Sequence, residues 1–346
     1  MHYTVKFPNK TVSYLLNTSF EHIDELIKRD ECIVITDKNV EKHHANLFKG
    51  FKKVIALEPG EASKSIENVQ IATQELLDVE AHRGSYIIGV GGGMTTDFTG
   101  FLASIYMRGV KFGYVPTSLL GMVDASVGGK NGINYQLQKN LLGTFNQPEF
   151  ILFDTAFLKT LPSEEWCNGF AEVIKYACLF DKEMFDELVE HDIAYYQKDD
   201  AATASVIAKC VDWKNKIVQS DELENGRRKL LNFGHTAGHA FETINNIPHG
   251  HAVALGMLVA CKVSEAHGLD KQVYAQLKTL LQQYNLPVII DTNIDKVMQV
   301  LNMDKKKNNN GIDFVLLKSI GDAYLKNVTT ENIKHTLEEF TNAGDS

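Results

Sequence analysis

Histidines gather in one short stretch of the chain. Four of the 12 histidines lie between residues 235 and 251, in the segments NFGHTAGH (residues 232–239) and HGH (residues 249–251). His235 and His239 are four residues apart, so their imidazoles share one face of a helix. Imidazoles placed in this way can both bind a metal, or one can bind it while the other transfers protons. The stretch therefore predicts a metal site, with His251 or His249 as a third ligand.

A carboxylate could complete such a site, and the segment GFAEVIK (residues 169–175) offers one. Glu172 stands in an otherwise apolar helical pattern, with Lys175 one turn further on. A buried carboxylate is costly unless it is paired or bound to a metal. Glu172 is therefore the best candidate for the remaining ligand.

Two glycine-containing segments could bind phosphate groups. A short apolar run, YIIGV, leads into Gly91, Gly92 and Gly93 and then toward Asp97. A strand that enters a helix through glycines lets backbone amides approach a pyrophosphate. Met94 stands where the dinucleotide fingerprint has its last glycine, so a tight turn without a ligand explains the segment equally well.

The second glycine-containing segment, DASVGGKNGINYQLQKN (residues 124–140), combines glycines with Lys130, Lys139 and Asn140. These groups can hold phosphate oxygens, although the segment does not match a P-loop. The alternative is a flexible surface loop. A charged run from Lys214 to Lys229 precedes the histidines, and on its own it indicates a solvated face.

The elements that must position these residues change character along the chain. Apolar runs at residues 32–37, 53–57, 86–90, 112–115 and 151–153 predict buried parallel strands separated by helices. Beyond residue 160, helical patterns cover residues 164–180, 182–191, 201–219, 236–244 and 252–266, with strands only at 314–317 and 323–325. The pattern predicts an α/β fold with a doubly wound parallel-sheet nucleotide-binding domain (residues 1–160) and a mainly α-helical metal-binding domain (residues 161–346).

Composition excludes several classes of function. The chain has 346 residues, a formal net charge of −9, 44% hydrophobic residues and no charged-then-apolar N-terminal signal. Its acidity argues against a broad nucleic-acid or membrane surface. Five cysteines without a C-x-x-C spacing argue against a disulfide framework and fit a cytoplasmic location.

The combination of segments resembles the 3-dehydroquinate synthases of the sugar phosphate cyclase superfamily over nearly the whole chain. The matching segments include GVGGGMTTDFTGF (89–101), VDASVGGKNGIN (123–134), KNLLGTF (139–145), GFAEVIK (169–175), LNFGHTAGHA (231–240) and PHGHAVALGM (248–257). Departures are the methionine in GGGMTTD, Asn146 where an aromatic residue or histidine is common, and a Lys305–Lys307 run that blurs which lysine matches.

The resemblance implies a role for each matching residue. The metal, zinc or alternatively cobalt, would be bound by Glu172, His235 and His251. NAD would be held by Asp37, Asn39, Glu61, Lys64, Gly92, Gly93, Met94, Asp97, Thr117, Ser118, Lys130, Lys139, Phe157 and Thr160. Substrate would meet Arg108, Asp124, Lys130, Asn140, Lys175, Lys214, Arg228, Asn232, His239, Lys305 and Lys306. Of all these, His239, Lys175, Asp124 and Lys130 would be catalytic, together with Glu224.

The implied reaction converts 3-deoxy-D-arabino-heptulosonate 7-phosphate, a phosphorylated sugar acid, into 3-dehydroquinate and phosphate in the shikimate pathway. NAD would oxidise C5 transiently, phosphate would leave by β-elimination, and re-reduction and an aldol closure would follow. Lys214 and Arg228 would bind the substrate carboxylate. Arg108 would reach the phosphate site of a neighbouring subunit, which implies a homodimer.

Three other interpretations compete with this one. Valiolone- or inosose-forming cyclases share the motifs but not the carboxylate pocket, and Lys214, Arg228 and His239 favour a carboxylated substrate. A metal-dependent polyol dehydrogenase would lack the phosphate-binding lysines. A non-catalytic binding protein would be expected to have lost a ligand.

Overall fold

The chain forms two compact units in the computed structural model, which describes residues 1–136, 138–304 and 311–342. The first unit contains residues Met1–Glu165 and Asp200–Leu223, and the second contains Trp166–Asp199 and the chain from Glu224 onward. The sequence predicted a single domain boundary after residue 160. The division into units is different, because the chain returns to the first unit for residues 200–223.

The first unit is built on a seven-stranded sheet with the order β1-β2-β9-β6-β5-β3-β4. The strands are β1 (His2–Lys6), β2 (Thr11–Leu16), β3 (Cys32–Asp37), β4 (Lys53–Leu57), β5 (Tyr86–Gly91), β6 (Lys111–Pro116) and β9 (Phe150–Phe153). Only the β1–β2 pair is antiparallel. Five of these strands were predicted from their apolar runs, and the α/β fold class is confirmed.

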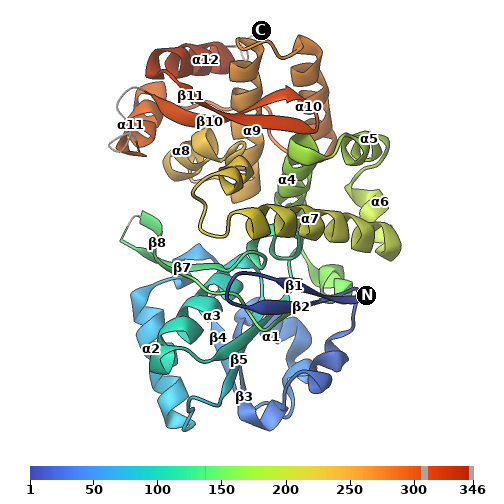
Figure 1. Cartoon of the computed structure of the whole chain (residues 1–346), viewed down its shortest axis with the longest axis vertical. Helices are drawn as coiled ribbons and strands as arrows, with labels where there is room; N and C mark the ends of the chain where they lie inside the picture. Colours follow the sequence, from blue (N-terminus) through green and yellow to red (C-terminus); the bar gives the residue numbers. More distant parts are fainter. Residues whose placement is uncertain (137, 305–310, 343–346) are drawn as a thin grey trace. The chain divides into compact units, whose positions relative to one another are not determined.

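Both faces of the parallel strands are covered. Ile33, Val34 and Ile35 of β3 are fully buried, which explains why the strand is a continuous β-branched run rather than an alternating one. Helices α2 (Ile66–Asp78) and α3 (Gly93–Ile105) lie on one face (Figure 1). On the other face, the core includes Phe20 of η1 (Phe20–Glu25) and Phe157 of η7 (Thr155–Thr160).

The strand order reverses beside β3. From β3 the chain passes outward to β4 and then crosses back to β5 on the other side of β3. In open α/β sheets, ligands bind outside the carboxyl ends of the strands at such a switch point. Here β3 ends at Asp37, β5 at Gly91 and β6 at Pro116, and these residues lie level because Thr36 pairs with Val90 and Gly91 with Pro116.

Three parts of the first unit differ from the sequence expectation, and the first is the β1–β2 pair, which no apolar run predicted. Residues 124–140 were expected as a phosphate-binding loop, but much of the segment forms an antiparallel hairpin of β7 (Lys130–Tyr135) and β8 (Gln138–Phe145). Helix α7 (Asp200–Ser220) packs in this unit rather than in the helical one. The buried hydroxyl of Tyr14 on β2 donates a 2.8 Å hydrogen bond to Asn215 Oδ1 on α7, which anchors the helix there.

The second unit is mainly helical. Its elements are α4 (Ser163–Phe180), α5 (Lys182–Glu190), α6 (Ile193–Lys198), η8 (Arg227–Asn232), α8 (His235–Asn245), α9 (His249–Glu265), α10 (Lys271–Gln283), α11 (Ile294–Asp304), the hairpin of β10 (Ile312–Ser319) and β11 (Asp322–Val328), and α12 (Thr330–Asn342). Helix α9 is almost wholly buried and forms the centre of the unit. None of the helices in the described part of the chain is long and apolar enough to cross a membrane.

Candidate active site

One carboxylate and two imidazoles of the second unit converge on a common point. Glu172 of α4 is fully buried, and its Oε1 lies 3.5 Å from His235 Nε2 of α8 and 3.6 Å from His249 Nε2 of α9. One ligand atom from each residue lies within 4.8 Å of the others. Two ligands that are each about 2.1 Å from a tetrahedral zinc lie about 3.4 Å apart. The observed spacing therefore fits donors that share one metal better than direct hydrogen bonds.

His249 takes the position in this group that the family resemblance gave to His251. The two histidines are the first and third residues of α9. A separation of two residues rotates a side chain by about 200° around a helix, so the two imidazoles leave α9 in different directions, and that of His249 faces Glu172. The spacing of the residues had left both histidines open, and the geometry selects His249.

The remaining nitrogen of each imidazole is held by an oxygen. His235 Nδ1 lies 3.2 Å from the carbonyl oxygen of Phe233, and His249 Nδ1 lies 3.3 Å from Glu242 Oε2. A carbonyl and an ionised carboxylate only accept hydrogen bonds, so each Nδ1 must carry the proton. In each ring, Nε2 is then the nitrogen that faces Glu172 and that a metal could bind.

The two imidazoles differ in charge. Burial and the nearby Lys175 ammonium lower the pKa of His235 to about 3, so His235 is neutral and its contact with Glu172 is not an ion pair at neutral pH. Burial also lowers the pKa of His249, but its contacts with Glu172 and Glu242 outweigh burial and raise the pKa to about 9. A metal would therefore have to displace a proton from His249.

Several predicted substrate and catalytic residues of the second unit lie near this group or near one another. Lys175 forms a buried ion pair with Glu172 Oε2, and the His239 ring is 5.2 Å from that of His235. Asn232 donates a 3.1 Å hydrogen bond to Glu224 Oε1. Arg228 is 2% exposed. The predicted Lys305 and Lys306 lie outside the described residues.

In the first unit, the predicted NAD contacts gather at the carboxyl edge of the sheet. Asp37 ends β3, Gly92 follows β5, and Thr117 follows β6. Others lie in the segments that leave this edge: Asn39, Gly93, Met94, Ser118, Phe157 and Thr160. Helix α3 begins at Gly93, and no side chain caps its first turn, as expected where backbone amides meet a pyrophosphate.

The glycines in this segment have two different roles. A Cβ added at Gly91 would lie 2.4 Å from Thr95 Oγ1, and one at Gly89 would lie 2.7 Å from Thr99 Oγ1. These two glycines let α3 pack closely on β5. Gly92 and Gly93 remain at the turn, where a side chain would separate the backbone from a ligand.

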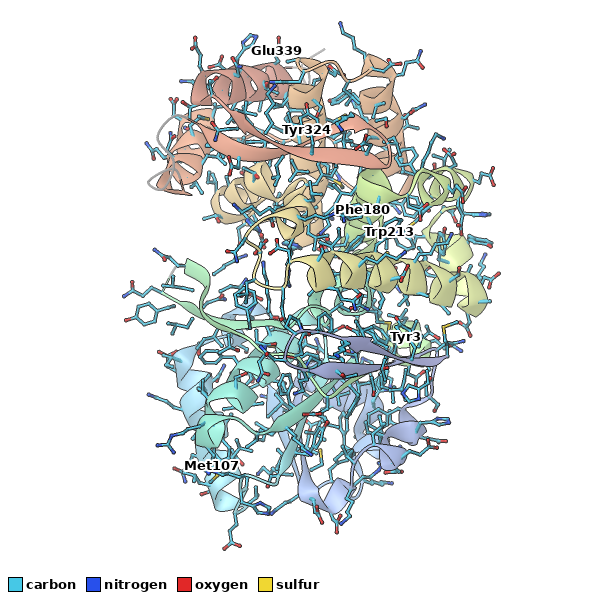
Figure 2. All side chains as sticks on the ribbon, viewed as in Figure 1. Tyr3, Met107, Phe180, Trp213, Tyr324 and Glu339 are labelled. Atoms are coloured by element: carbon cyan, nitrogen blue, oxygen red, sulfur yellow. The ribbon has the colours of Figure 1, made fainter. Side chains whose placement is uncertain are left out.

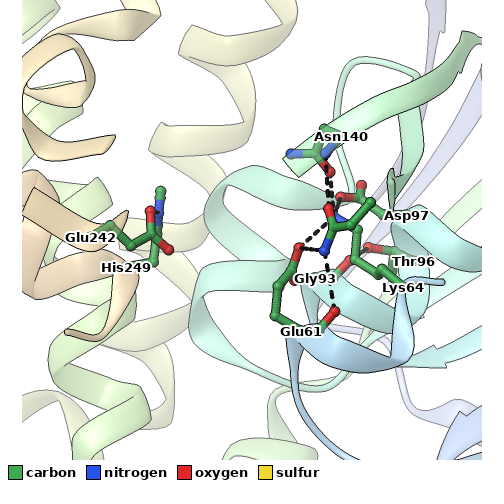
Figure 3. A network of polar contacts seen from close by, with 9 residues as sticks. Glu61, Lys64, Gly93, Thr96, Asp97, Asn140, Glu242 and His249 are labelled. Atoms are coloured by element: carbon green, nitrogen blue, oxygen red, sulfur yellow. Dashed lines mark hydrogen bonds and ion pairs between the residues drawn. The ribbon is translucent and has the colours of Figure 1, made fainter. Parts of the chain in front are cut away.

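The buried Lys64 connects three other residues predicted from the sequence (Figure 3). Lys64 is 3% exposed, and its Nζ lies 2.7 Å from Asp97 Oδ2, 2.5 Å from Asn140 Oδ1 and 3.2 Å from Glu61 Oε1. The pKa of Lys64 is lowered by burial but raised by Asp97 and Glu61, with a net rise. The resemblance assigned Asn140 to substrate and the other three to NAD, and the structure places all four in one cluster.

Asp124 and Lys214 form a second polar pair in this unit. Asp124 lies in a short π-helical turn, η6 (Gly121–Ala125), a conformation that often marks functional sites. Lys214 Nζ of α7 lies 2.9 Å from Asp124 Oδ1 and 2.7 Å from its carbonyl oxygen. Lys214, which is predicted to bind the substrate carboxylate, thus also orients Asp124, which is predicted to be catalytic. Lys130 and Lys139 lie on the β7–β8 hairpin with exposed side chains.

Comparison with known proteins gives a consistent result. Residues 54–168 match the family model described as 3-dehydroquinate synthase N-terminal, and residues 169–307 match the one described as 3-dehydroquinate synthase C-terminal. The 3-dehydroquinate synthase of Clostridium beijerinckii is 39% identical over 331 residues, which cover 92% of this chain and 93% of the relative. This chain belongs to the 3-dehydroquinate synthase family.

Solved structures show that the fold extends beyond 3-dehydroquinate synthases. The 2-epi-5-epi-valiolone synthase of Streptomyces hygroscopicus, solved with NAD⁺ and Zn²⁺, matches with a TM-score of 0.88 and 24% identity over 99% of this chain and 98% of its own. A 2-deoxy-scyllo-inosose synthase, solved with NAD⁺ and Co²⁺, matches with a TM-score of 0.86 and 24% identity over 98% and 100%. Identity this low shows the fold alone.

One residue expected from the 3-dehydroquinate synthase resemblance stands on an unusual turn. After α3, Met107 and Arg108 both have positive φ angles, of 48° and 70°, and Gly109 follows at 114°. Positive φ is unfavourable for side chains of this kind. The turn leaves Arg108 exposed, and Met107 beside it is 38% exposed (Figure 2).

The sequence motifs missed one polar residue beside the group of Glu172, His235 and His249. Glu242 contacts the His249 imidazole, yet no motif marked it. The spacing of residues could have identified Glu242. It follows His235 by seven residues and His239 by three, so it lies on the same helical face as both. A histidine outside the sequence motifs, His44, contacts one of the predicted NAD residues, because its Nε2 lies 3.0 Å from Thr160 Oγ1.

Proposed function

We propose that this protein converts 3-deoxy-D-arabino-heptulosonate 7-phosphate into 3-dehydroquinate and phosphate. The observation that carries the proposal is the group of Glu172, His235 and His249 beside buried Lys175, within a chain whose two halves both match the family. Neither half of the match carries the activity alone, because the reaction needs both a hydride acceptor and a cation-rich substrate site.

The metal would be divalent and held by Glu172, His235 and His249. Nitrogen and carboxylate donors suit zinc and cobalt alike, and structures with the same fold contain Zn²⁺ or Co²⁺. NAD would bind at the carboxyl edge of the sheet, between Asp37 and the glycine turn at Gly92. When bound, NAD supplies reversible hydride transfer, and the metal supplies Lewis-acid polarisation of a substrate oxygen.

The residues of the chain would bind and orient the substrate. Lys130, Lys139 and Asn140 suit the phosphate because cationic and amide groups donate to its oxygens. Lys175 supplies a positive charge beside Glu172, and His239 can exchange protons near the metal ligands. Asn232 and Glu224, which are hydrogen-bonded to each other, would orient substrate hydroxyls.

Lys214 and Arg228 would bind the carboxylate and so distinguish this substrate from neutral sugar phosphates. Arginine can hold a carboxylate bidentately, and lysine adds a point charge. The exposed Arg108 turn supports a homodimer in which Arg108 contributes to a neighbouring site. We also propose a cytoplasmic location, which five free cysteines fit.

The first experiment measures phosphate release from the heptulosonate phosphate while NAD absorbance is followed. Stoichiometric phosphate without net NADH accumulation is expected. Net NADH formation would instead indicate a polyol dehydrogenase.

The second experiment tests the carboxylate. Arg228→Ala should lower kcat/KM for the heptulosonate phosphate, because the buried substrate carboxylate loses its partner. The expected loss of transition-state binding free energy is about 2–5 kcal/mol. Any turnover of sedoheptulose 7-phosphate, which lacks the carboxylate, should change little. Exposed Arg227→Ala is the matched control. Equal losses on both substrates would show that Arg228 is structural.

A further inference from the structure

Glu242 stands where it can act on the metal group without belonging to it. Its side chain is 12% exposed, and its Oε2 lies 3.3 Å from His249 Nδ1; Figure 3 shows the two side chains beside each other. The other nitrogen of the same ring lies 3.6 Å from Glu172 Oε1. The imidazole of His249 is therefore held between two carboxylates from two different helices.

The Nδ1 atom of His235 has a weaker hydrogen-bond acceptor than that of His249. His235 Nδ1 faces a neutral backbone carbonyl, at 3.2 Å, whereas His249 Nδ1 faces a carboxylate. A carboxylate that accepts a hydrogen bond from an imidazole fixes the ring orientation and the tautomer, and it makes the opposite nitrogen a stronger electron donor. The two histidines of the group thus have different supports.

We propose that Glu242 is a positioning residue that orients His249 and strengthens its bond to the metal. The inference rests on the proposed metal site. Glu242 does not touch the metal or the substrate in this assignment. It acts through His249, and its removal should weaken metal binding by roughly 10- to 100-fold rather than abolish it.

The test compares Glu242→Gln and Glu242→Ala with the wild-type protein. Glutamine keeps the shape but removes the charge, and alanine removes both. Glu265→Gln is the matched control, because Glu265 lies on α9, is 11% exposed and pairs with Lys262 rather than with a histidine. Zn²⁺ affinity would be measured by competition with a chelator, and the visible absorption of the Co²⁺-loaded protein would report the ligand geometry.

The expected order of Zn²⁺ affinity is wild type and Glu265→Gln, then Glu242→Gln, then Glu242→Ala, with a shifted Co²⁺ spectrum for both Glu242 variants. Thermal unfolding in excess chelator separates this effect from a fold defect, and the rate of Zn²⁺ release from the loaded protein measures binding in folded molecules only. Wild-type affinity, release rate and spectrum in both Glu242 variants would overturn the inference but leave the metal site. A wild-type protein that binds neither ion would overturn the metal site and the inference together.

Discussion

The two units each contain a buried polar cluster, and the clusters are opposites. In the first unit, the Lys64 ammonium is central and is surrounded by oxygens at 2.5–3.2 Å. In the second unit, the Glu172 carboxylate is central. One of its oxygens pairs with Lys175, and the other lies 3.5 and 3.6 Å from two imidazole nitrogens.

The difference in distance separates a complete cluster from one that is spaced for an ion. Contacts of 2.5–3.2 Å are direct hydrogen bonds, so the Lys64 ammonium is held by oxygens of its own cluster. Contacts of 3.5–3.6 Å are too long for good hydrogen bonds but match the separation of two ligands on one metal. The Lys64 cluster therefore stabilises the fold and shapes a surface for a ligand. In the Glu172 cluster, the donor atoms themselves would bind the ligand.

The largest effect is expected from Glu172→Gln. The variant removes the shared ligand, so Zn²⁺ affinity should fall on the order of 100-fold or more. It also leaves the Lys175 ammonium buried beside a neutral amide, which should cost about 3–5 kcal/mol of unfolding free energy in the metal-free protein. Chelator competition and urea unfolding measure the two effects separately.

The double variant Glu172→Met, Lys175→Met is the control for the Glu172 prediction. It removes both charges, so most of the stability should return while Zn²⁺ binding stays lost. Stoichiometric Zn²⁺ in Glu172→Gln would contradict the assignment of the central ligand.

A smaller effect is expected from Lys64→Met in the first unit. The substitution leaves Asp97 and Glu61 without their cation, but these side chains are 22% and 42% exposed and keep some water. The loss should therefore be about 2–3 kcal/mol of unfolding free energy, below that for a fully buried pair. NAD affinity should also fall, which calorimetric titration would measure.

The control for Lys64→Met is Lys38→Met, in which an exposed lysine loses its partner Glu58. Exposed pairs contribute about 1 kcal/mol or less. A loss in Lys64→Met no larger than in this control would show that the Lys64 cluster is not a stabilising unit.

The smallest effect is a change with pH. Burial raises the pKa of Asp97, and Lys64 opposes this rise, so removing Lys64 should raise the pKa further. A carboxyl with a raised pKa destabilises the fold as pH rises through that pKa. The loss of unfolding free energy in Lys64→Met, relative to wild type, should therefore be smallest in acid and should grow as pH rises. Urea unfolding midpoints measured from about pH 4 to about pH 8 would show this. In Lys64→Met, Asp97→Asn, this pH dependence should disappear.

Sequence patterns predicted the elements that are buried on both faces. Strand β3, in which every residue is buried, and the half-buried edge strand β4 were both located with their observed bounds, because each is a short apolar run rich in β-branched or aliphatic residues. The β7–β8 hairpin was missed because its residues are mostly polar or exposed, and its pairing joins residues that local sequence does not relate. Helix α7 was predicted as a helix, but its return to the first unit depends on contacts such as Tyr14 with Asn215.

The sequence by itself determined which chemical groups are present and which of them share a helical face, because a period of 3.6 residues places His235, His239 and Glu242 on one stripe. It could not decide between His249 and His251, since both are histidines of one short motif. The tertiary structure decided this, because the packing of α4, α8 and α9 fixes the single direction from which Glu172 meets α9. The identity of a ligand is local, but its orientation depends on helices that are far apart in the chain.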